Sequence, residues 1–154
     1  MKPKIIMTAK SDAQEHVLER IGGREVMTIC HLGGLWYGDS SATSLVEHYK
    51  DLATLAKIVT EEGSNVVMFS GCTSPNLPLS TILAGKFLLS NTGLKHVLLF
   101  SAKKLERHHD DWFSGNIFLL NNYGLSVCRS YEKITGDDFF DEAIKIAKDL
   151  NKQK

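Results

Sequence analysis

The segment that decides the fold is Asn65–Pro78, with the sequence NVVMFSGCTSPNLP. Its beginning, Asn65–Ser70, is almost entirely apolar, which is typical of a strand that is covered on both faces in a parallel sheet. The residues that follow, GCTSPN, are small or polar and predict a turn. A strand of this kind needs a layer on each side of the sheet, so the segment predicts an α/β protein.

On both sides of this segment, apolar runs alternate with helical patterns, as they do in parallel α/β sheets. The other predicted strands are Lys4–Thr8, Glu25–Cys30, His96–Phe100 and Leu125–Arg129. Helices are predicted at about 11–21, 44–62, 79–89, 109–122 and 138–150. We therefore expect a three-layer α/β sandwich around a mostly parallel five-stranded sheet, Rossmann-like or flavodoxin-like, in a single domain that spans residues 1–154.

Composition and charge exclude several classes of protein. The chain of 154 residues carries 18 basic and 18 acidic side chains, so its formal net charge is zero, which argues against duplex nucleic acid or an anionic membrane as partner. No apolar run approaches the roughly 20 residues of a membrane span. Cys30, Cys72 and Cys128 are odd in number and lack CxxC spacing, which argues against a disulfide framework or a zinc site. We expect a cytoplasmic protein with reduced thiols.

The segments that follow the first four predicted strands are rich in small, hydroxyl and basic residues. Ligands of open α/β sheets bind beyond the carboxyl ends of the strands, where small residues let the backbone approach and helix starts hold anions. We expect a small-molecule or nucleotide ligand with a phosphate at this edge, although glycine and serine are also common in turns that bind nothing. The candidate binding residues are Thr8, Lys10, Ser11, Ser70, Gly71, Cys72, Thr73, Ser74, Asn76, Ser101, Ala102, Lys103 and Lys104.

Two side chains are candidates for catalysis. Cys72 follows the buried strand, where a nucleophile or an acid is often placed, but a free cysteine also fills tight turns as a small inert residue. His48 lies near the start of the helix predicted at 44–62, from which a general base can reach the strand ends, and its alternative is a solvated surface histidine. The run His108–Asp111 has no HxxxH spacing, so we expect no metal site there.

Five pieces between Asn65 and about Val127 follow one another in a fixed order: VVMFSGCTSPN, ILAGKFLLSNT, HVLLFSAKK, then Asn116-Ile117 and Gly124. Their order and spacing resemble the flavoprotein family that includes phosphopantothenoylcysteine decarboxylase and the lantibiotic cysteine decarboxylases. The resemblance implies an FMN site made by Ser11, the turn 71–76 and the turn 101–104, with His48 as the catalytic histidine. It also implies decarboxylase or reductase activity, and a homo-oligomer, since the family builds its flavin site at subunit contacts.

Other classes of protein share parts of the same pattern. NVVMFSGCTSP is similar to the strand and Gly-Thr turn of CRISPR-associated Rossmann-like domains, which implies a module that senses or cleaves a cyclic oligonucleotide, and Lys103 and Lys104 would suit its phosphates. GCTS is similar to the cysteine turn of aspartate/glutamate racemases and arylmalonate decarboxylases, which implies a cofactor-free cysteine-dependent enzyme, although those carry two such turns. A non-catalytic binding protein with the same fold is a further alternative.

Overall fold

The computed structural model describes residues 3–9, 20, 25–30, 49–69, 77, 79–105 and 112–152. The described strands are β1 (Ile5–Ala9), β2 (Val26–Cys30), β3 (Val66–Phe69), β4 (His96–Lys104), β5 (Trp112–Asn121) and β6 (Gly124–Thr135). The described helices are α3 (Tyr49–Glu62), α4 (Leu79–Asn91) and α5 (Gly136–Lys152). The helix predicted at 11–21 lies outside the described residues except for Arg20.

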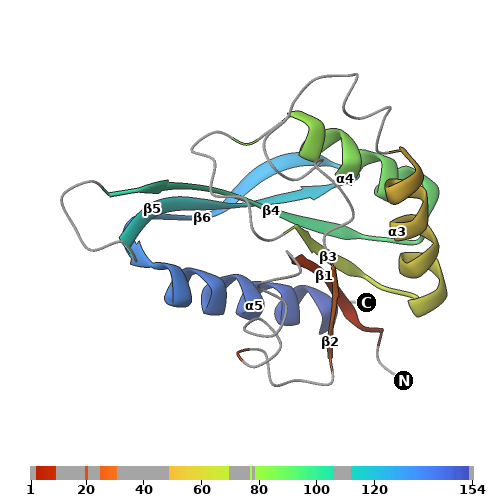
Figure 1. Cartoon of the computed structure of the whole chain (residues 1–154), viewed down its shortest axis with the longest axis horizontal. Coiled ribbons are helices and arrows are strands. Elements are labelled where there is room, and N and C mark those ends of the chain that lie inside the picture. The colour runs from red at the N-terminus through yellow and green to blue at the C-terminus, as the bar shows by residue number, and fades with distance from the viewer. Residues whose placement is uncertain are drawn as a thin grey trace.

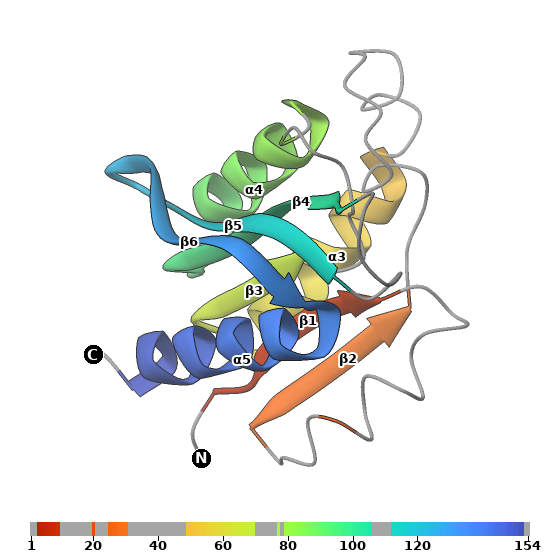
Figure 2. The same cartoon turned by 90° about the vertical axis from the view of Figure 1, so that its left-hand side faces the viewer.

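The strands form one six-stranded sheet in the order β2-β1-β3-β4-β5-β6 (Figures 1 and 2). The first four are parallel to one another, whereas β5 runs antiparallel to β4 and β6 runs antiparallel to β5. The predicted α/β class is therefore confirmed. The predicted sheet of five mostly parallel strands is wrong, because the sheet has six strands and is mixed.

The error lies in the helix predicted at 109–122, whose described part is the strand β5. Phe113, Ile117 and Leu120 follow one another at the spacing of a helical stripe. In the structure, Ile117 and Leu120 are buried on opposite faces of the sheet, against different helices. A strand that is apolar on both faces shows no alternation, so its apolar residues imitate helical spacing. The neighbouring strands are also longer than predicted, because β4 continues to Lys104 and β6 to Thr135.

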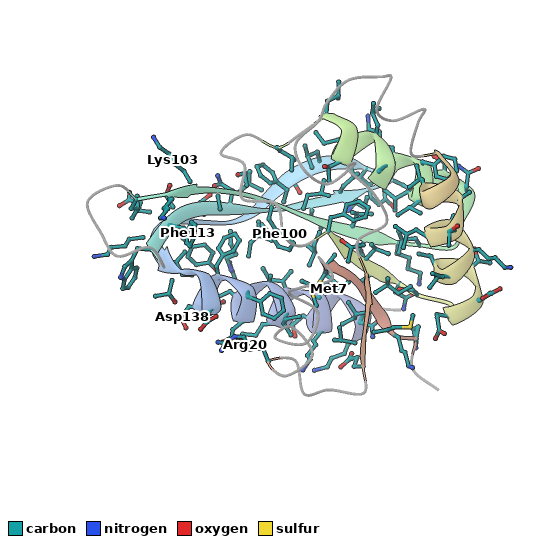
Figure 3. All side chains as sticks on the ribbon, in the orientation of Figure 1. Met7, Arg20, Phe100, Lys103, Phe113 and Asp138 are labelled. Atoms are coloured by element: carbon teal, nitrogen blue, oxygen red, sulfur yellow. The ribbon has the colours of Figure 1, made fainter. Side chains whose placement is uncertain are left out.

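Helices cover the sheet on both faces (Figure 1). Helices α3 and α4 pack on one face, where the buried side chains include Ile6, Val67 and Leu99. Helix α5 packs on the other face, against residues that include Met7 and Phe100 (Figure 3). Since side chains of a strand point alternately to the two faces, each central strand contributes to both apolar cores. Among the described helices, none is long and apolar enough to cross a membrane.

Helix α5 is fixed at its start by a cap and by a close contact with the sheet. The backbone N–H of Asp138 donates to the hydroxyl oxygen of Thr135 at 3.2 Å, which is a helix N-cap interaction. One turn into the helix, Phe139 lies against Gly115 of β5, where a Cβ would stand 2.9 Å from the Phe139 ring and 3.0 Å from the backbone oxygen of Ser101. Glycine is therefore needed at position 115 for α5 to approach the sheet this closely.

Replacing Gly115 by alanine should lower the free energy of unfolding by about 1–3 kcal/mol, because the added methyl overpacks a site where backbone limits relaxation. Urea denaturation followed by circular dichroism measures the change. The matched control is Gly93→Ala, since a Cβ at Gly93 meets nothing within 4 Å. Equal denaturation midpoints for the two variants would contradict the packing described here.

His96, at the start of β4, is a half-buried imidazole. Its Nδ1 is buried and has no hydrogen-bond partner among the described residues. Burial lowers the pKa of His96 below its ordinary value of 6.5, and the positive charge of Lys95 lowers that pKa further. The unfolded chain therefore binds this proton more readily than the folded one. Stability contributed by the neutral imidazole is present above pH 6.5 and is lost as the pH falls through the folded-state pKa.

We expect the urea midpoint of the protein to fall as the pH is lowered from about 7.5 to about 5.5. The urea midpoint of the variant His96→Gln should fall less over the same pH range, because glutamine cannot take up the proton. Midpoints of both proteins at several pH values give the comparison. If the two pH profiles run parallel, another group is responsible for the dependence.

Candidate functional site

Strands β1, β3 and β4 are parallel, so their carboxyl ends meet at one edge of the sheet, which is the edge that the sequence predicts as the ligand site. Of the predicted binding residues, Thr8, Ser101, Ala102, Lys103 and Lys104 lie in the described part of the chain. The other predicted binding and catalytic residues lie outside it: Lys10, Ser11, His48, Ser70, Gly71, Cys72, Thr73, Ser74 and Asn76.

Three polar side chains cross the sheet side by side on β4, β5 and β6. Ser101 pairs with Asn116, and Asn116 pairs with Ser130. The Asn116 amide Nδ2 donates to the Ser101 hydroxyl at 3.3 Å, and the Ser130 hydroxyl donates to Asn116 Oδ1 at 2.7 Å. Ser101 is buried, Asn116 is half-buried and Ser130 is exposed. We call these three residues the polar row.

The polar row lies on the face of the sheet that carries α3 and α4. Val97 and Leu99 precede Ser101 on alternate positions of β4 and belong to the core under these helices, and Lys103 continues the same alternation. Figure 3 shows Lys103 pointing away from the sheet on the side opposite α5, with Phe113 on the α5 side. The polar row and Lys103 therefore share one face at the carboxyl end of β4.

The predicted turn 101–104 is a continuation of β4, and this divides its residues between the two faces. Ala102 is buried and pairs with Gly115, which packs against α5. Lys104 follows Ala102 on the α5 face, so it does not share a surface with Lys103. The structure thus brings Ser101 and Lys103 together and separates them from Ala102 and Lys104.

Two buried threonines, one on β1 and one on α4, lie near the same edge on the side of the sheet that carries α3 and α4. Thr8 ends the buried part of β1 and pairs with Phe69, whose ring belongs to the core under α3 and α4. Thr81 lies in the first turn of α4, one turn before Gly85, which packs on Val97 and Leu120. The hydroxyl of Thr81 is buried and has no hydrogen-bond partner among the described residues. The start of α4 therefore brings an unused polar group toward the carboxyl half of β4.

The groups with shifted pKa values on β6 belong to the opposite face. Burial raises the pKa of the Cys128 thiol, against an opposing effect of Arg129, and it also raises the pKa of Tyr131 with help from Glu142. Both side chains pack on the α5 core. A thiol held in its neutral form is a poor nucleophile, so Cys128 is not a catalytic candidate. Within the described residues, no group of three His, Cys, Asp or Glu side chains could hold a metal ion.

Among the described residues, the polar row and Lys103 offer groups for hydrogen bonds and for charge, and none of these four residues is a general base. The polar row offers hydroxyl and amide groups, and Lys103 offers an exposed ammonium group. These groups suit the polar edge of a flat ring and an anion. Sequence reasoning found Ser101 and Lys103, and it noted Asn116 through the Asn-Ile pair of the family motif. It missed Ser130, whose place beside Asn116 depends on the pairing of β5 with β6.

No family model and no curated protein matches this chain. One solved structure with a limited likeness is phosphoribosylglycinamide formyltransferase from Campylobacter jejuni subsp. jejuni NCTC 11168. It is 9% identical in sequence and aligns with a TM-score of 0.34 over 96% of this chain and 90% of that chain. A TM-score this low supports no inference about fold or ligand, so the flavoprotein resemblance stays a prediction.

The hydrogen bond between Asn116 and Ser101 should be measurable as a coupling energy between the two side chains. Asn116→Ala leaves the buried hydroxyl of Ser101 without its donor, which should cost about 1–3 kcal/mol of unfolding free energy. When Ser101 is already alanine, Asn116→Ala should lower the unfolding free energy by less than it does in the wild-type protein. A double-mutant cycle in urea should give a coupling of about 0.5–1.5 kcal/mol. Strict additivity would show that the two side chains do not interact.

Proposed function

We propose that this chain binds a small nucleotide that carries a phosphate, and that flavin mononucleotide is the first such ligand to test. The observation that supports the proposal is the polar row together with Lys103 on one face at the carboxyl end of β4. In the proposed complex, the polar row contacts the ring of the ligand. Lys103 contacts the phosphate.

The spacing along β4 suits a ligand with a polar ring and a separate phosphate. Lys103 lies two residues beyond Ser101, which is roughly 7 Å along a strand. The extended lysine side chain adds further reach, and its ammonium group is a point charge that binds phosphate. A ring held at the row would therefore place a phosphate on a short chain within reach of Lys103.

FMN is the first ligand because separate parts of the family resemblance converge on this site. Ser101 belongs to the segment HVLLFSAKK and Asn116 belongs to the Asn-Ile pair. In the structure these two residues form a hydrogen bond across adjacent strands. The dioxo part of the flavin ring has carbonyl oxygens and an N–H group, which match the donors and acceptors of hydroxyl and amide side chains.

A cyclic oligonucleotide is the second candidate, and the position of Lys103 favours it. Its ammonium group stands exposed beside a row of neutral polar groups, an arrangement that fits a base next to a phosphodiester. The predicted catalytic residues His48 and Cys72 lie outside the described residues, so we propose binding and no reaction step. The predicted homo-oligomer likewise remains a prediction.

The purified protein should retain FMN through gel filtration, and visible absorption of the protein peak measures the retained flavin. Lys103→Glu should weaken FMN binding at least about tenfold, because it replaces an attractive charge by a repulsive one at the phosphate. Lys104→Glu is the matched control, since it changes the net charge equally on the opposite face. Equilibrium dialysis gives the dissociation constants.

The same assay separates the two candidate ligands. A protein that ignores FMN but binds a cyclic oligoribonucleotide, with a loss in Lys103→Glu, would support the second candidate and reject the first. A protein that binds neither ligand would refute the proposed function. Equal losses in Lys103→Glu and Lys104→Glu would show that net charge, and not the site described here, controls binding.

A further inference from the structure

Asn116 is held on both sides by the residues of neighbouring strands. Its amide nitrogen donates to Ser101 on β4 and its amide oxygen accepts from Ser130 on β6. Both partners pair directly with Asn116 across the sheet, so the two hydrogen bonds run sideways in opposite directions. The amide therefore cannot rotate about its terminal torsion without losing both of them.

The sideways bonds leave half of the amide unused. A primary amide carries two N–H donors and two acceptor lone pairs. The lateral N–H and the lateral lone pair are the ones that reach neighbouring strands. The remaining N–H and lone pair lie next to each other and point away from Cβ, which means away from the sheet. Asn116 is half-buried, so part of the residue reaches the surface.

We propose that Asn116 is the specificity-determining residue of the site, and that it selects a planar ring with a hydrogen-bond donor and an acceptor side by side. This inference rests on the proposed function and deepens it. The amide donor lies toward β4 and the acceptor toward β6, so the ring must present its acceptor on the β4 side and its donor on the β6 side. The fixed amide thereby selects the ring and sets its orientation in the plane.

Several ring systems carry the required edge. The flavin ring has N3–H next to the carbonyl at C4, and adenine has its 6-amino group next to N7. Guanine presents two acceptors, O6 and N7, on its major-groove edge, but its N1–H lies next to O6 and matches as well. The shared chemistry is a donor beside an acceptor, and the choice between flavin and a nucleobase follows from which ligand the protein binds.

The test combines a variant with a modified ligand. The variant is Asn116→Asp, in which the carboxylate keeps the shape of the side chain and can accept from both serines but cannot donate. The modified ligand is FMN methylated at N3, which cannot donate from that position. Each change alone should weaken binding by about tenfold or more. Together they should weaken it no more than methylation alone does, because the methyl group holds the ring edge away from Asn116 and leaves the substitution no contact to remove.

Asn121→Asp is the matched control, because Asn121 lies on the same strand at its far end and its Oδ1 accepts from the Tyr123 backbone N–H at 2.9 Å. It adds the same negative charge and should leave FMN binding unchanged. Circular dichroism of both variants checks that they fold. If Asn116→Asp does not fold, binding of N3-methylated FMN to the wild-type protein still tests the inference. The inference requires that the wild-type protein bind this ligand more weakly than FMN.

Several results would overturn the inference while leaving the proposed function intact. One is FMN binding that depends on Lys103 but tolerates N3-methylation. Another is a methylation penalty that persists in full in Asn116→Asp, which would mean that the carboxylate acts through its charge alone. If the protein binds a cyclic oligoribonucleotide and not FMN, Asn116→Asp should weaken that binding by about tenfold or more, and unchanged binding in this variant would overturn the inference. A wild-type protein that binds neither class overturns both proposals.

Discussion

The four side chains of β3 are shielded from water on both faces of the sheet, and this constraint governs the rest of the architecture. Their exposed fractions are at most 1%. Val67 and Phe69 require cover from α3 and α4, whereas Val66 and Met68 require cover from α5. Since α4 returns the chain to the sheet on one face, the chain must change sides before its last helix. The antiparallel pair β5 and β6 extends the sheet, and the chain passes to the other face where β6 ends at Thr135 and α5 begins at Gly136.

The candidate site arises where the apolar cover of one face ends. Along β4 and β5, paired residues change from Val97–Leu120 and Leu99–Phe118 to Ser101–Asn116 and then Lys103–Ser114. The first two pairs pack under the helices. The next two offer hydroxyl, amide and ammonium groups on the same face. A single surface therefore supplies both the packing that holds α4 and the polar groups that a ligand would use.

Local sequence signals located β1 to β4 and the described helices α3, α4 and α5, because apolar runs and helical patterns alternate clearly in these parts of the chain. They failed at β5, where Phe113, Ile117 and Leu120 imitate a helix, although Gly115 disfavours a helix interior and the aromatic residues favour a strand. They also could not find Ser130. A register shift between Ile117 and Phe118 places Ser130, and not Arg129, beside Asn116. Such a shift depends on how two strands pair and leaves no local signature.

The mixed sheet also has a consequence for the order in which the chain folds. Strands β5 and β6 are joined by a two-residue turn between Asn121 and Gly124, and hairpins of this kind form in roughly 1–10 μs. Strand β1 pairs with β3 through Ile6 and Val67, so it must wait for a large loop to close. We therefore expect Asn116 and Ser130 to meet early. These two residues, which are proposed to contact and orient the ligand, would be in place before the central parallel strands have paired.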